Sequence, residues 1–156
     1  MPTTLSNVMS EFKIPSLSLE HANLFQNLRD RIAGNVTGPI LEILLDGMSV
    51  MFVLSKEYRK NIEGFDAGYQ IQDIDGGVSL GFTFKNGVMK VEKKGVSKPN
   101  INVIFKDTAA MRDFLFSENP DILDFVLNSK VTYVGNLNYL MKFAYMAKHL
   151  QLRILK

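Results

Sequence analysis

The spacing of apolar residues changes along the chain from a helical period to a strand period. Up to about residue 60, apolar side chains recur every three or four positions. This spacing predicts one helix from Ser18 to Gly34 and a second from Thr37 to about Lys60. Beyond it, apolar and polar residues alternate, as in strands with one buried face. The alternation predicts four strands: Tyr69–Ile74, Val78–Phe84, Val88–Val96 and Ile101–Phe105.

Turn residues between these strands indicate how the strands pair. Asp75-Gly76-Gly77 separates the first two, and Asn86-Gly87 separates the second from the third. Asn-Gly is a strong hairpin signal because both residues tolerate positive φ. A loop from Gly95 to Asn100, which contains Pro99, precedes the fourth strand. The order predicts an antiparallel meander.

The helical period returns near the C-terminus. Asp107 is expected to cap one short helix, and Asn119-Pro120-Asp121 is expected to begin another. A fifth strand at residues 131–134, a corner at Gly135-Asn136 and a long last helix follow. The pattern predicts an α+β protein, with a loose arm at residues 1–17 and one domain at residues 18–156.

The last helix is more apolar than an ordinary surface helix. Its polar residues form one narrow stripe: Asn138, Lys142, Tyr145 and His149. Two apolar flanks remain, and a helix that packs on a single core needs only one. One flank is expected to cover the sheet. The other requires more of this chain, such as Ile40–Leu54, a partner chain such as a second copy in a homodimer, or an apolar ligand.

Composition narrows the function classes. The chain has 156 residues, enough for one domain that buries its own core, and 46% of them are hydrophobic. The net charge of +2 argues against a nucleic-acid-binding protein with a broad basic face. The absence of cysteine excludes disulfides and thiolate chemistry. The N-terminal segment has no basic stretch followed by an apolar run, so we expect no signal peptide and a cytoplasmic location.

No catalytic constellation stands out. His21 and His149 lie far apart and outside any metal-binding spacing, so both are expected to be exposed structural residues. Two pairs of aspartates lie close in sequence, Asp73 with Asp75 and Asp121 with Asp124. Turn and helix-cap roles explain them better than acid–base or magnesium chemistry. We therefore expect neither an enzyme nor a cofactor.

Lysines surround the Asn86-Gly87 hairpin. They are Lys85, Lys90, Lys93, Lys94 and Lys98, opposed only by Glu92. A solvated strand edge protected from aggregation is the favoured interpretation. The alternative is peripheral contact with anionic lipid headgroups.

From about Asn61 onward the chain resembles the sterol carrier protein domain, the nonspecific lipid-transfer type. The resemblance rests on four segments: Phe82–Gly87, Ile101–Phe105, Asn119–Asp121 and Lys130–Asn136. The helix start Leu140-Met141-Lys142-Phe143 is also similar to the family pattern. Asn128-Ser129 stands where the family usually has glycine before the strand lysine, and Asn tolerates a left-handed turn there.

The resemblance implies a five-stranded, mainly antiparallel sheet covered on one face by helices, with an apolar tunnel between them. Such a tunnel holds fatty acyl, sterol-like or isoprenoid lipids and carries out no reaction. The residues expected to line it are Phe82, Phe84, Phe105, Met111, Phe114, Phe125, Leu137, Leu140, Met141, Phe143 and Met146. The alternative function is a protein-interaction or homodimerisation module that uses the same helix flank.

Overall fold

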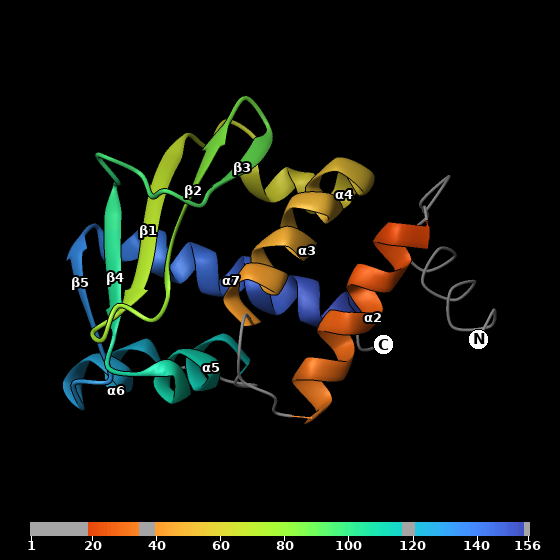
Figure 1. Ribbon diagram of the computed structural model, residues 1–156. Coiled ribbons are helices and arrows are strands. Elements are labelled where there is room, and N and C mark those ends of the chain that lie inside the picture. Colours follow the sequence, from red (N-terminus) through yellow and green to blue (C-terminus); the bar gives the residue numbers. More distant parts are fainter. Residues whose placement is uncertain (1–18, 35–39, 117–120, 155–156) are drawn as a thin grey trace.

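The computed structural model describes residues 19–34, 40–116 and 121–154 (Figure 1). The predicted arm at residues 1–17 and the Ser18 cap lie outside these ranges. The elements are α2 (Leu19–Gly34), α3 (Ile40–Leu54), α4 (Lys56–Arg59), the short 3-10 helix η1 (Lys60–Ile62), β1 (Ala67–Asp73), β2 (Ser79–Lys85), β3 (Val88–Glu92), β4 (Ile101–Phe105), α5 (Thr108–Phe116), α6 (Ile122–Leu127), β5 (Val131–Gly135) and α7 (Leu137–Ile154).

Five strands form one sheet in the order β3-β2-β1-β4-β5. All neighbouring pairs are antiparallel except β1 with β4, which is parallel. The predicted α+β class and the mainly antiparallel five-stranded sheet are therefore confirmed. The meander is correct for β1, β2 and β3 but wrong for β4, which lies beside β1 instead of β3.

The loop between β3 and β4 crosses the sheet face that points away from the helices. A Cβ added to Gly81 of β2 would lie 2.7 Å from the Val96 side chain, and one added to Gly68 of β1 would lie 3.1 Å from it. Gln70, between these glycines on the same face, accepts the Val96 N–H through Oε1 at 2.9 Å. The two glycines thus leave room for the loop to pass, and the chain leaves β3 at Glu92, earlier than the predicted Val96.

The opposite face of the sheet carries the core. Alternate residues of the three central strands are fully buried, namely Tyr69, Ile71, Phe82, Phe84, Ile101, Val103 and Phe105. The Phe143 ring of α7 lies 5.2 Å from that of Phe82, and Phe114 of α5 lies 5.5 Å from Phe105. The long helix α7 also contacts α3 and α2, so it extends from the sheet to the two N-terminal helices (Figure 1).

The second predicted helix is interrupted. α3 ends at Leu54, and Ser55 adopts an extended conformation whose side chain accepts the Tyr58 N–H and so caps α4. This break turns the chain so that Tyr58 is fully buried. A continuous helix to Lys60 was predicted because the apolar period runs through Ser55, whereas the serine cap redirects the backbone.

Residues with positive φ, the left-handed backbone region, form the corners on either side of β5. Gly135 has a φ of 125° at the predicted corner, and the Asn136 side chain accepts the Asn138 N–H at the start of α7. The left-handed residue before β5 is Ser129, with a φ of 57°, whereas Asn128 ends α6 at a negative φ. The left-handed turn expected from Asn128 is thus present one residue later.

We expect Gly81→Ala to destabilise the protein by about 1–3 kcal/mol, the usual cost of inserting an atom into a packed site. The added Cβ would also lie 2.8 Å from the Val96 backbone nitrogen, so the crossing loop would have to move. Urea unfolding measures the change. Gly77→Ala is the matched control, because its added Cβ would meet only Asp73 Oδ2 at 3.5 Å. Equal stability of the two variants would contradict the close approach of the loop.

Candidate functional site

Most of the predicted tunnel residues lie in the interior between sheet and helices. Nine are buried: Phe82, Phe84, Phe105, Met111, Phe114, Phe125, Leu140, Phe143 and Met146. Leu137 is half-buried. Met141 is 51% exposed, because it lies on the solvent side of α7 close to Tyr145. The structure therefore brings one flank of α7 together with the sheet and leaves Met141 outside that interior.

Aromatic rings pack these residues into two groups. Phe82 stacks on Tyr69 with 4.8 Å between ring centroids, and Phe143 lies 5.9 Å from Tyr69. In the second group, Phe114 of α5 lies 5.5 Å from Phe105 and 5.6 Å from Phe125. Side chains at this separation make direct contact. The interior is thus occupied by its own side chains, and a role of these residues in lining a tunnel stays a prediction.

An apolar cavity opens at one end of this interior. It has a volume of about 230 Å³ and lies between the start of α3, the β1–β2 turn and the start of α5. Its lining consists of Ile40, Leu41, Glu42, Gly77, Val78, Ser79, Leu80, Thr108 and Met111. Met111 is the one predicted tunnel residue that lines it. The cavity is therefore a candidate entrance from the surface to the apolar interior.

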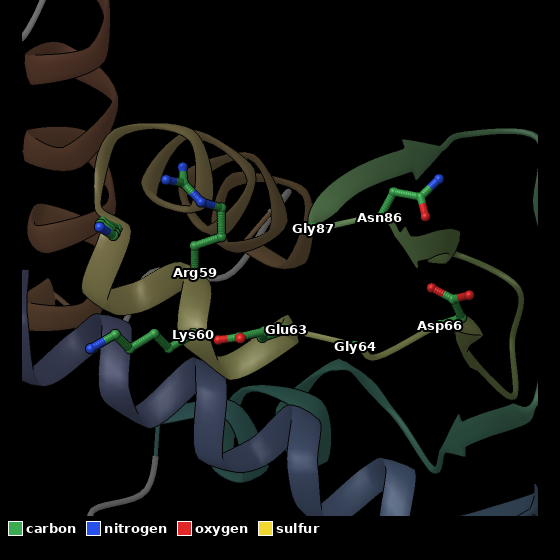
Figure 2. Close-up of a pocket in the computed structure, with 8 residues that line it drawn as sticks. Arg59, Lys60, Glu63, Gly64, Asp66, Asn86 and Gly87 are labelled. Carbon is green, nitrogen blue, oxygen red and sulfur yellow. The ribbon is translucent and has the colours of Figure 1, made fainter.

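A second cavity, polar in character, lies at the other end of β2. It measures about 650 Å³ and is bounded by α4, η1, the start of β1 and the β2–β3 hairpin (Figure 2). Three cations, two carboxylates and three turn residues line it, namely Lys56, Arg59, Lys60, Glu63, Asp66, Gly64, Asn86 and Gly87. Both signs of charge thus face one cavity.

Two buried tyrosine hydroxyls position α7. Tyr58 donates to the Met146 carbonyl at 2.7 Å, and Tyr69 donates to the Tyr139 carbonyl, also at 2.7 Å. Burial raises the pKa of both phenols, so both keep the proton that they donate. An unpaired buried hydroxyl is costly, and these bonds therefore hold α7 in register with α4 and β1.

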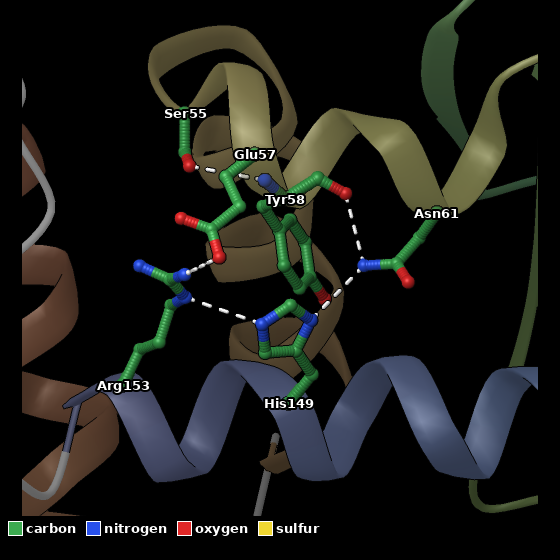
Figure 3. Close-up of polar contacts among 6 residues, drawn as sticks. All are labelled: Ser55, Glu57, Tyr58, Asn61, His149 and Arg153. Carbon is green, nitrogen blue, oxygen red and sulfur yellow. Dashed lines mark hydrogen bonds and ion pairs between the residues drawn. The ribbon is translucent and has the colours of Figure 1, made fainter.

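His149 of α7 takes part in a polar network with α4 and η1 (Figure 3). The Asn61 Nδ2 lies 3.1 Å from the His149 Nδ1, and the Arg153 Nε donates to His149 Nε2 at 3.2 Å. Arg153 also pairs with Glu57 at 2.6 Å. The prediction that His149 is exposed is therefore wrong. The break at Ser55, between α3 and α4, places Tyr58 and Asn61 against its ring.

The surroundings of His149 oppose its protonation. Partial burial lowers its pKa, the Arg153 cation lowers it further, and Glu57 acts in the opposite direction. Arg153 can only donate, so a neutral ring with its lone pair on Nε2 accepts this bond, whereas protonation would place an N–H on Nε2 against the Arg153 N–H. The neutral imidazole is thus the form that fits this network.

Asp73 and Asp121, one from each pair of aspartates, have structural partners. Asp73 Oδ1 accepts the Val78 N–H in the β1–β2 turn at 3.4 Å, and Asp121 accepts the Asp124 N–H as the cap of α6.

No group of three metal-ligating side chains occurs among residues 19–34, 40–116 and 121–154. The side chain of His21 lies outside what the structure describes. Among the described helices, none is long and apolar enough to cross a bilayer.

The hairpin lysines are partly paired. Lys93 reaches Glu42 of α3 at 3.0 Å, and Lys90 reaches Glu92 at 3.4 Å. Both lysine side chains remain 72% exposed. Lys93, the residue after β3, thus links this edge of the sheet to α3, and the Ser49 hydroxyl of α3 donates to the Met89 carbonyl of β3.

Sequence reasoning missed several residues of the interior and of the cavities. Tyr69 and Leu80 share the strand parity of Phe82, so alternation alone could have identified them. Tyr58 and the α4 cations had no such signal, because they occupied one side of an assumed continuous helix. Their positions depend on the break at Ser55.

Comparison with known proteins identifies the fold. No family model matches the sequence, and no curated protein matches it. The sterol carrier protein domain 2 of Helicoverpa armigera superimposes with a TM-score of 0.51, covering 74% of this chain and 89% of that one at 14% identity. The resemblance noted in the sequence is thus confirmed as one of fold: the chain has the fold of sterol carrier protein domains.

Two other solved structures match part of this chain. The stereoselective inverting sec-alkylsulfatase Pisa1 from Pseudomonas sp. has a TM-score of 0.50 and 16% identity over 56% of this chain. This chain spans only 14% of that enzyme's length. The ubiquinone synthesis protein UbiJ-SCP2 aligns over 62% of this chain and 76% of that one, with 14% identity and a TM-score of 0.49.

Acidification is expected to lower stability through His149. Its ordinary pKa is 6.5 and the native pKa is lower, so below about pH 6.5 the unfolded chain binds a proton that the native chain resists. The free energy of unfolding should therefore fall as the pH drops through this range. Chemical unfolding of the wild type and His149→Gln from about pH 7.5 to about pH 5 isolates the effect, since other groups contribute to both. If the free energy of unfolding fell by the same amount with pH in both proteins, His149 would not be the source of the acid destabilisation.

Proposed function

We propose that this chain binds the apolar part of a lipid between its sheet and helices and carries or presents that lipid without chemical reaction. The observation that carries the proposal is the apolar cavity of about 230 Å³ that opens onto the interior at Met111. The fold supports it, because the sheet and the helices enclose a continuous apolar interior. Fatty acyl, sterol-like and isoprenoid lipids all present the hydrocarbon surface that this interior would cover.

The cavity by itself is smaller than a typical ligand pocket, which occupies about 300–1,000 Å³. It therefore accommodates the end of a hydrocarbon chain, and deeper entry requires side chains to move. Met111 forms part of its lining and is fully buried. A methionine side chain has three rotatable bonds and adapts easily to a new neighbour. Entry is thus expected to begin with a rotamer change at Met111.

The energetics favour such a ligand. Each methylene removed from water contributes about 0.8 kcal/mol, so a hydrocarbon tail binds through burial with few polar contacts. Polar groups lie among the apolar lining in Glu42, Ser79 and Thr108. Glu42 is already paired with Lys93, and the Ser79 hydroxyl already accepts from the Gln70 amide, so Thr108 is the group left to contact a hydroxyl or carboxyl end. Exchange with a bilayer would bring the exposed hairpin lysines, Lys85 and Lys94 included, near anionic headgroups.

Organic extraction of the purified protein, followed by mass spectrometry, tests the proposal directly. We expect a co-purified lipid in the extract and, after extraction, uptake of a fluorescent fatty acid by the delipidated protein. A refolded protein that neither carries lipid nor takes up the probe would exclude lipid binding. Circular dichroism of the same sample confirms that the protein has refolded.

Val78→Trp should block the entrance. Val78 is half-buried and lines the apolar cavity, so an indole at this position fills space that the ligand would use. We expect affinity for the fluorescent fatty acid to fall by about tenfold or more, because about 1.4 kcal/mol of lost burial changes affinity tenfold. Ile74→Trp is the control, because Ile74 lies before the same turn, is 66% exposed and does not line the cavity. Equal affinities of the two variants would place the entrance elsewhere.

A further inference from the structure

The polar cavity has features of a binding site that the lipid proposal does not use. It lies beyond the C-terminal end of β2, next to Asn86 and Gly87, whereas the apolar cavity lies at the other end, next to Ser79. The seven-residue strand separates them by about 20 Å, at roughly 3.3 Å per residue. A ligand in one cavity therefore does not occupy the other.

Three cations form one wall of the polar cavity. Lys56 and Arg59 come from α4, and Lys60 begins η1 (Figure 2). Arg59 is held in place because its Nη1 donates to the Phe52 carbonyl at 2.9 Å and to the Val53 carbonyl at 3.1 Å. A guanidinium fixed in this way, with two flexible ammonium groups beside it, suits an anion with several acceptor oxygens, such as a phosphate.

Two carboxylates face the same space from the segment that leads into β1. They are Glu63 and Asp66, both exposed. Among the described residues, no ion pair joins either of them to Lys56, Arg59 or Lys60. Cations and anions that share a cavity without neutralising each other can be bridged by a ligand that carries both charges. The presence of both cations and carboxylates in one cavity favours a zwitterionic ligand over a simple anion.

The far side of the cavity is formed by backbone with little side-chain bulk. Gly64, Asn86 and Gly87 all have positive φ, at 66°, 54° and 76°. A Cβ added to Gly64 or Gly87 would have no heavy atom within 4 Å, so these positions border open space. The Asn86 amide supplies a donor and an acceptor at this side.

Exposed apolar residues flank the cavity. Val88, which follows Gly87, is 60% exposed, and Val53, whose carbonyl binds Arg59, is 70% exposed. The packing of α3 against β3 places both on the same end of the molecule, since the Ser49 hydroxyl bonds to the Met89 carbonyl. Apolar tips beside cations are a pattern found in proteins that bind membrane surfaces.

We propose that the polar cavity binds a zwitterion that carries a phosphate and a primary ammonium group. The phosphate lies against Lys56, Arg59 and Lys60, and the ammonium group lies against Glu63 and Asp66. Phosphoethanolamine has this chemistry, either as a free molecule or as the headgroup of a phospholipid. A quaternary ammonium lacks the N–H donors that carboxylates prefer, so phosphocholine is expected to bind more weakly.

Titration calorimetry of the full chain with phosphoethanolamine tests the site. We expect binding that is stronger than that of inorganic phosphate or of ethanolamine alone. Lys56→Ala and Glu63→Gln should each weaken it about tenfold, the value of one charge-assisted hydrogen bond. Lys98→Ala and Asp75→Asn are matched controls outside the cavity and should leave the affinity unchanged. Equal binding of phosphate and phosphoethanolamine, or no effect of Lys56→Ala and Glu63→Gln, would overturn the proposal.

Vesicle flotation separates the two sources of the ligand. If the headgroup is the source, vesicles that contain phosphatidylethanolamine should retain more protein than phosphatidylcholine vesicles, and Val53→Asp with Val88→Asp should abolish the difference. If the free molecule is the source, phosphoethanolamine binds in calorimetry and the two vesicle types retain equal amounts. If the protein bound neither phosphoethanolamine in calorimetry nor either type of vesicle in flotation, the proposal would be wrong.

The proposed zwitterion site does not depend on lipid entry at the apolar cavity. Val78→Trp alters only that cavity, so phosphoethanolamine should bind to this variant with unchanged affinity. Loss of fatty acid uptake with retained phosphoethanolamine binding would separate the two sites. A parallel loss of both ligands in this variant would contradict the independence of the polar cavity.

Discussion

The structure depends on two hydrogen bonds that attach the last helix to the rest of the core. Tyr58 and Tyr69 come from different elements, yet each donates its hydroxyl to a carbonyl of α7, at Met146 and Tyr139. The two carbonyls are seven residues apart, which is close to two helical turns, so both lie on the same side of α7. Because a buried hydroxyl needs a partner, these bonds determine how far along the sheet α7 lies and which face it buries.

The position of α7 in turn determines the character of the interior. With Tyr69 bonded to Tyr139, Phe143 comes to lie against the rings of Tyr69 and Phe82. Met141 is turned outward by the same rotation of the helix. The interior is rich in aromatic rings and methionines, and the unbranched methionine side chain adapts to a new neighbour more easily than a branched aliphatic one. The lipid binding that we propose would use this property, because side chains would fill the interior without ligand and would move aside when a ligand enters.

The two cavities divide the molecule into an apolar end and a charged end. The apolar cavity is lined by the first residues of α3 and β2, and the polar cavity is lined by residues that follow the C-terminal ends of these two elements. Lys93 and Glu42 join β3 to α3 near the apolar cavity, and Arg59 covers the carbonyls at the end of α3 near the polar one. A change in the position of α3 would therefore affect both cavities, although the ligands proposed for them are chemically distinct.

Local sequence patterns determined the elements of this protein, because the period of apolar residues reports directly which face of a helix or strand is buried. The strands at Tyr69, Phe82 and Ile101, the cap at Asp121 and the corner at Gly135 all follow from neighbours in the chain. Most of the buried residues expected around the tunnel follow from the same alternation.

Only the tertiary structure decided the features that join distant segments. β4 lies parallel to β1 because Gly68 and Gly81 let the Val96 loop cross the sheet, and no local period encodes that crossing. The break at Ser55 brings Tyr58 and Asn61 to α7, which places His149 in a network instead of in solvent. The charges of the polar cavity also come from separate elements. These charges all lie within residues 56–66, and what depends on tertiary packing is their meeting with the distant hairpin residues Asn86 and Gly87. Residue spacing carries no record of that contact.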